Sequence, residues 1–194
     1  MKERPPLSHD LLVQIGFSLL LFTLILLYYS LDLTFLGIPF TTLLFLSPFI
    51  LRQKIHYRFT ASDLGEAVLF STVVLLPFCF LILVLGGAFR IPETRKILFY
   101  LFLVAIPEEV YFRGVFQGGI GNNLQAVLYS SLLFVFLHSP RFIITGDISA
   151  LLTFFPSLLM GYLYMKKKNL LHPILFHFLS DIMFISIKAQ EITL

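Results

Sequence analysis

Long apolar stretches alternate with short polar connectors along the whole chain. A helix that crosses a hydrocarbon core of about 30 Å needs roughly 20 apolar residues, and stretches of about this length recur throughout. Glycine, proline and charged residues separate them. The pattern predicts an all-α fold, a polytopic membrane helix bundle of about seven transmembrane helices. These helices are predicted at about residues 11–29, 35–51, 67–89, 97–116, 124–138, 149–165 and 170–187.

The composition agrees with this pattern. Of the 194 residues, 58% are hydrophobic and only 13% are charged, whereas soluble domains are about a quarter charged. A domain of this size cannot hide so much apolar surface in its interior, so the surplus must face lipid. A disulfide scaffold, a disordered tail and an ordinary cytosolic enzyme are excluded. We expect residues 1–194 to form a single integral-membrane domain and the lone Cys79 to be buried and inert.

The formal net charge of +3 comes from short basic clusters in the connectors. Such clusters indicate membrane topology rather than nucleic-acid binding, so no nucleic-acid partner is expected. With the N-terminus inside, the inner connectors hold eight Lys and Arg residues and the outer ones five, which favours this orientation. The basic residues of the 90–96 connector argue for the opposite orientation.

The fourth predicted helix carries three charged residues in mid-span, Glu108, Glu109 and Arg113. Charged groups near the bilayer centre cost at least about 2.5–3.5 kcal/mol each, so they require an explanation. Glu109 and Arg113 are four residues apart and can pair on one face of the helix. Glu108 lies about 100° around the helix and has no partner there, which leaves its carboxylate available to accept a proton from water.

Two later helices supply the other ionisable residues. The fifth carries His138 four residues after Phe134, and the seventh carries His177 and Asp181 on one face. With alternating topology, Glu108 and these three ionisable residues lie about 10–19 Å from the same membrane face. Each feature alone has a structural explanation, such as an ion pair that locks the bundle. Together they favour one shared intramembrane site.

These residues, in this order, resemble the CAAX-protease and bacteriocin-processing (CPBP, or Abi) family of intramembrane endopeptidases. Each of its three motifs has a gap of three residues: two glutamates and then arginine, phenylalanine and then histidine, and histidine and then asparagine or aspartate. They are matched by Glu108-Glu109 and Arg113, by Phe134 and His138, and by His177 and Asp181. The resemblance covers about residues 97–187, which we expect to form the catalytic core.

The resemblance implies endoproteolysis of a membrane-tethered peptide or protein within the lipid bilayer. Glu108 would activate a water molecule with the assistance of His138. His177 and Asp181 would stabilise the developing oxyanion, and Glu109, Arg113 and Phe134 would support the site. The resemblance also implies a multi-pass protein of the plasma membrane of a prokaryote.

Position 181 departs from the pattern, since many family members carry asparagine there. An ionised aspartate cannot donate a hydrogen bond to an oxyanion, so Asp181 is either protonated or orients His177. Two histidines and the glutamates offer ligands for zinc, but the chain lacks the His-Glu-x-x-His motif. We favour a metal-free glutamate mechanism without a cofactor, with zinc as the alternative.

Other functions use the same residues. A transporter or proton-relay protein also buries carboxylates and histidines in its spans, and a noncatalytic scaffold or immunity protein keeps the fold without the chemistry. Within the family, prenylated C-terminal tails, bacteriocin leaders and C-terminal sorting anchors are candidate substrates, and the sequence selects none of them. His172 precedes Pro173 at a helix start and is expected at the membrane interface, outside the site.

Overall fold

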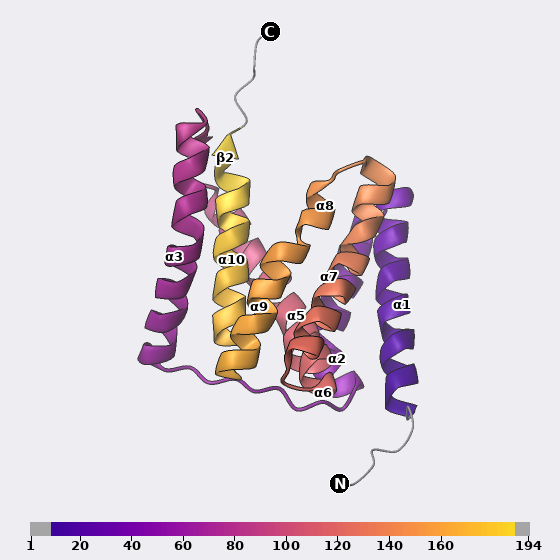
Figure 1. The fold of residues 1–194 in the computed structure, drawn as a ribbon. Coiled ribbons are helices and arrows are strands. Elements are labelled where there is room, and N and C mark those ends of the chain that lie inside the picture. Colours follow the sequence, from indigo (N-terminus) through magenta and orange to yellow (C-terminus); the bar gives the residue numbers. More distant parts are fainter. Residues whose placement is uncertain (1–8, 189–194) are drawn as a thin grey trace.

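The computed structural model describes residues 9–188, which form a bundle of helices running up and down (Figure 1). The helical segments are α1 (His9–Ser30), η1 (Thr34–Leu36), α2 (Gly37–Ile50), α3 (Ala61–Val84), α4 (Thr94–Phe99), η2 (Tyr100–Ala105), α5 (Ile106–Glu109), η3 (Val110–Gln117), α6 (Gly118–Ile120), α7 (Leu124–Thr145), α8 (Ser149–Leu152), α9 (Phe154–Lys167) and α10 (Leu171–Ser186). Two short strands, β1 (Ala88–Phe89) and β2 (Ile187–Lys188), pair antiparallel. The predicted all-α class is confirmed.

Three of the described helices are long and apolar enough to cross a membrane: Leu12–Ser30, Ala61–Val84 and Leu124–Thr145. Thr34–Ile50 and Leu171–Ser186 are apolar but shorter. The count of seven transmembrane helices therefore stays a prediction. Only 11% of the apolar window of α3 is buried, so most of this helix presents apolar side chains outward. Cys79 on α3 is partly exposed, and the expectation that it is buried was wrong because α3 lies at the edge of the bundle (Figure 1).

The third predicted helix, 67–89, is displaced toward the N-terminus in the structure. α3 begins at Ala61 because Thr60 caps it, with its side-chain oxygen accepting a hydrogen bond from the Asp63 backbone N–H at 3.0 Å. It ends at Val84, and residues 88–89 form β1 instead. Thr60 is polar and precedes the apolar stretch, so a prediction from hydropathy alone placed the start of this helix too late.

The fifth predicted helix does not end at Ser139-Pro140 as expected. α7 continues to Thr145 and ends at Gly146, which has a left-handed backbone (φ 73°). Pro140 has no N–H for the carbonyl of Phe136, but the Ser139 hydroxyl donates to that carbonyl at 2.7 Å. The lost backbone bond is thus replaced. The sixth predicted helix is divided into α8 and α9.

The fourth predicted helix is one continuous helical stretch, from α4 to α6, that contains two π-helical segments. These segments, η2 and η3, flank the short α5 that carries Glu108 and Glu109. The stretch continues past the expected break at Gly118 and ends at Gly121, whose φ of 147° favours glycine. Wider π turns occur frequently at functional sites, and here they lie on both sides of the two glutamates.

η3 lies at the centre of the bundle, and nearly all of its side chains are buried. It contacts α2 and α7, while α10 packs against α3 and α9 and α7 packs against α1 and α9. The main hydrophobic core surrounds η3 and includes Tyr111, Phe112, Val115, Phe134 and Phe176. Glu109 on α5, Phe134 on α7 and His177 on α10 are buried around this central segment.

Candidate active site

The candidate site contains a fully buried ion pair. The carboxylate of Glu109 on α5 accepts a hydrogen bond from Nη1 of Arg113 at 3.0 Å, and both side chains have no exposed surface. Nη2 of Arg113 donates to the hydroxyl and the backbone carbonyl of Ser157 on α9, at 2.8 and 2.9 Å. The spacing of Glu109 and Arg113 predicted their pair. Ser157 was missed, because a single serine in an apolar stretch carries no signal of its partner.

His177 on α10 joins this pair. Its Nδ1 lies 2.9 Å from Oε1 of Glu109, the oxygen that also accepts from Arg113. An ionised carboxylate only accepts hydrogen bonds, so Nδ1 carries the hydrogen. The other ring nitrogen, Nε2, lies 3.8 Å from Oε2 of Glu108 and 3.5 Å from Oδ2 of Asp181. The first and third sequence motifs therefore meet at one imidazole ring.

Glu108 and Asp181 differ from Glu109, whose Oε1 accepts two hydrogen bonds. Within residues 9–188, the buried oxygens without a hydrogen-bond partner include Oε2 of Glu108, Oδ2 of Asp181 and the second oxygen of Glu109, Oε2. The first two face Nε2 of His177, so mutual attraction requires a proton on that nitrogen or on one of the two carboxyls. Three titratable side chains at these distances are suited to proton transfer.

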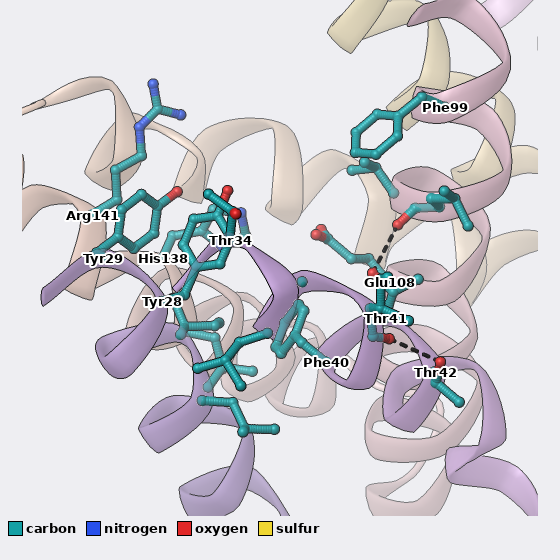
Figure 2. Close-up of a pocket in the computed structure, with 18 of the residues that line it drawn as sticks. Tyr28, Tyr29, Thr34, Phe40, Thr41, Thr42, Phe99, Glu108, His138 and Arg141 are labelled. Atoms are coloured by element: carbon teal, nitrogen blue, oxygen red, sulfur yellow. Dashed lines mark hydrogen bonds between the residues drawn. The ribbon is translucent and has the colours of Figure 1, made fainter. Parts of the chain in front are cut away.

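His138 on α7 lies across a cavity from this group. Its Nδ1 is 2.8 Å from the carbonyl oxygen of Phe134, and a carbonyl can only accept. Nδ1 therefore carries the hydrogen, and Nε2 of the neutral ring is an acceptor. Glu108 and His138 line the same cavity of about 540 Å³. Figure 2 shows their side chains on opposite sides of it, and among the described residues no ion pair joins them.

The ring of Phe134 packs against side chains from all three motifs. Its ring, 2% exposed, stacks on His138 with centroids 4.3 Å apart and meets His177 edge-on at 5.9 Å. The guanidinium carbon of Arg113 lies 5.1 Å from the centroid of the same ring. Phe134 therefore contacts one residue from each of the three motifs, which explains how a phenylalanine supports the site.

The cavity is mainly apolar and reaches beyond the matched motifs. Its walls come from α1, η1, α2, α4, η2, α5, η3 and α7. Its polar lining, apart from Glu108 and His138, consists of Tyr28, Tyr29, Thr34, Thr41, Thr42 and Arg141 (Figure 2). A mainly apolar cavity of this volume with a few polar groups is typical of a binding site. The sequence did not predict that α1 and α2 contribute to the cavity, because these two segments resemble the family only as generic membrane spans.

Among the described residues, no three His, Cys, Asp or Glu side chains are arranged to hold a metal ion. Oε1 of Glu109 is occupied by its bonds to Arg113 and His177, and His138 lies across the cavity. The described residues therefore do not fit a preformed zinc site, and metal dependence stays a prediction that an activity assay with a zinc chelator tests.

His172, expected at the interface, is 1% exposed. It is buried because α3 begins earlier than predicted and packs against α10. Nε2 of His172 lies 3.7 Å from Oε2 of Glu66 on α3, and His172 does not line the cavity that holds Glu108. Its place at the membrane interface, outside the site, stays a prediction.

The family model of type II CAAX prenyl endopeptidase Rce1-like proteins matches residues 67–183, more than half of the chain and all the motif residues. No curated protein and no solved structure matches. The apolar helices and the family together indicate an integral membrane protein. The chain therefore belongs to the type II CAAX prenyl endopeptidase Rce1-like family, a protease family that acts on membrane-associated proteins, as the three motifs predicted.

Proposed function

We propose that this protein is an intramembrane endopeptidase that hydrolyses a peptide bond of a membrane-associated protein or peptide with a water molecule activated by Glu108. The observation that carries the proposal is the position of Glu108. Its side chain extends into the cavity, while its buried Oε2 has no hydrogen-bond partner among residues 9–188 (Figure 2). A general base needs both access to substrate and an unoccupied oxygen.

In the proposed reaction, a water molecule in the cavity lies between Glu108 and His138. Nε2 of His138 accepts a hydrogen bond from the water, because Nδ1 already donates to the Phe134 carbonyl. Glu108 takes a proton as the water oxygen attacks the scissile carbonyl carbon. When the tetrahedral intermediate collapses, the carbon–nitrogen bond breaks and Glu108 gives the proton to the leaving amine.

The oxyanion of the intermediate needs hydrogen-bond donors in a water-poor site. His177 with a proton on Nε2 is one donor, and Glu109 keeps its ring in place through Nδ1. Asp181 is the second donor when its carboxyl is protonated; when ionised, it instead orients His177. Arg113 holds Glu109, so Glu109 and Arg113 position the site without touching the substrate.

The test compares the wild type with Glu108→Gln on a membrane-tethered peptide, using full-length protein in lipid vesicles. Glutamine keeps the size of the side chain but cannot act as a base, so we expect a loss of roughly 10²-fold or more. The thermal midpoint of both proteins controls for folding. Equal activity would overturn the role of Glu108. Activity that persists in a zinc chelator supports the metal-free mechanism, whereas a loss that added zinc restores supports the zinc alternative.

The same buried carboxylates and histidines also favour a second candidate, a transporter or proton relay. This function predicts proton flux across vesicles that depends on Glu108 without any peptide cleavage. A noncatalytic scaffold or immunity protein predicts neither cleavage nor flux, and a cellular phenotype that Glu108→Gln leaves intact. The helices running up and down support multi-pass placement, which we propose in the plasma membrane of a prokaryotic cell (Figure 1).

A further inference from the structure

The connector from α2 to α3 runs along one end of the bundle, past the ends of α9 and α10 (Figure 1). A second cavity lies between this connector and the end of α9. We call it the basic pocket. Its volume is about 400 Å³, and its lining consists of Ile55, His56, Tyr57, Arg58, Lys167, Lys168 and Asn169. Four of these seven side chains are basic, and none is acidic. The lining therefore favours an anion.

The two chain segments that form the basic pocket are held together by hydrogen bonds. The backbone N–H of Arg58 donates to Oδ1 of Asn169 at 3.1 Å, and Nδ2 of Asn169 donates back to the Arg58 carbonyl at 2.9 Å. The N–H of Leu170 donates to the carbonyl of His56 at 3.2 Å. Asn169 is 2% exposed. The basic side chains are therefore presented by a fixed backbone, which lowers the entropic cost of binding.

The acidic residues near the basic pocket neutralise only part of its charge. Arg58 pairs with Asp63 at 2.9 Å, and Lys167 pairs with Glu66. Among residues 12–187, Lys168 has no carboxylate within ion-pairing distance. Its backbone is left-handed (φ 48°) at the end of α9, and its side chain is exposed. Lys168 is therefore free to pair with an anionic ligand.

Apolar side chains are exposed beside these cations. Ile55, Tyr57 and Phe59 on the connector are 39%, 58% and 62% exposed. Exposed aromatic and apolar side chains beside Lys and Arg, at the ends of apolar helices, are typical of the headgroup level of a membrane. Basic pockets between helices at this level bind anionic lipid headgroups. The ligand is thus expected to be both anionic and apolar.

We propose that the basic pocket binds a phosphate group carried by an anionic phospholipid of the adjoining leaflet. Lys168 and His56 contact the phosphate oxygens, and the apolar side chains of the connector lie against the lipid. The proposal rests on the membrane location of the chain and is independent of the proteolytic mechanism.

Binding in the basic pocket also affects the packing of η3, the helical segment that carries Arg113. A Cβ atom on Gly114 of η3 would lie 2.9 Å from the Ile55 side chain, so the connector packs closely against this helix. Gly114 follows Arg113 directly. A lipid that holds the connector in place therefore stabilises the packing around η3, and its binding raises the thermal midpoint.

The experiment titrates full-length protein in neutral detergent with phosphatidylglycerol, with phosphatidylcholine of the same acyl chains, or with inorganic phosphate, and records the thermal midpoint. The pocket variant is Lys168→Gln. Its matched control is Lys166→Gln, because Lys166 is equally close to the end of α9 but lies over the Tyr162 ring at 5.5 Å and does not line the pocket. His56→Gln replaces Lys168→Gln if the latter fails to fold.

We expect phosphatidylglycerol to raise the midpoint of the wild type and Lys166→Gln, and phosphatidylcholine to have no effect. Loss of one lysine contact weakens the apparent affinity of Lys168→Gln for phosphatidylglycerol about fivefold. Equal affinity of Lys168→Gln and the wild type, or equal weakening in both lysine variants, would overturn the proposal. A shift with inorganic phosphate as large as that with phosphatidylglycerol would overturn the assignment to a lipid.

Discussion

Oε1 of Glu109 accepts a hydrogen bond from Nδ1 of His177 at 2.9 Å, although the two residues are 68 positions apart in the chain. The same oxygen accepts from Arg113 at 3.0 Å. One carboxylate thus ties α10 to the ion pair of the central helix. The neighbouring Glu108 has no such bond at its buried Oε2 within the described chain. Two adjacent glutamates therefore have different surroundings, and this difference can be measured.

Glu109→Gln is expected to destabilise the protein much more than Glu108→Gln. Glutamine at position 109 leaves the Arg113 cation buried without its counter-charge, which costs about 3–5 kcal/mol. Glu108 has no ion pair with Arg113, so its replacement is expected to change the unfolding free energy by about 1 kcal/mol or less. Thermal unfolding of both variants in the same detergent checks this. Equal midpoints would contradict the structural role of Glu109.

The sequence predicted which ionisable side chains of helices four and seven lie together better than it predicted the bounds of those helices. The spacing of Glu109 and Arg113 and that of His177 and Asp181 depend only on local helix geometry, and the cost of burying charge indicated that they belong together. The ends of helices depend on single polar side chains. Thr60 caps α3 and Ser139 compensates for Pro140, and hydropathy does not register either effect.

The residues that pack against the site could not be predicted from the sequence. An apolar stretch does not reveal which neighbour it contacts, so neither Ser157 on α9 nor the cavity walls from α1 and α2 were identified. His172 illustrates the same limit, since its burial depends on α3 packing against α10. Tertiary contacts in an apolar bundle are specified by shape rather than by a polar pattern.

Ser157→Ala is expected to weaken the positioning of Arg113. The variant removes the hydroxyl acceptor at 2.8 Å but keeps the backbone carbonyl acceptor, so the cost is about 1–3 kcal/mol of unfolding free energy. Cleavage should fall through kcat with little change in KM, because Ser157 does not line the cavity. The matched control is Ser131→Ala. Ser131 is equally buried, but its hydroxyl donates only within α7, and full activity of this variant is expected.

Phe134→Leu is expected to lower activity more than stability. Leucine keeps much of the apolar volume, so the stability loss is about 1.5 kcal/mol or less. The flat face that stacks on His138 and Arg113 is lost, and misplacement of His138 is expected to reduce kcat about tenfold or more. Phe17→Leu is the control, because Phe17 is buried in the same core but packs against Tyr111 rather than His138. Equal activity losses in the two variants would show that Phe134 acts only by filling space.

Asp181→Asn and Asp181→Ala together separate the two roles of this residue. If a protonated Asp181 donates to the oxyanion, the asparagine amide replaces that donor, and kcat/KM stays within about tenfold of the wild type. Alanine offers no donor, so a loss of about 10²–10³ is expected for it. We expect this pattern because Glu109 already orients His177 through Nδ1, which leaves no need for Asp181 to do so. An asparagine variant as inactive as the alanine variant, with both folded by thermal unfolding, would instead mean that the charge of Asp181 acts on Nε2 of His177 across their 3.5 Å separation.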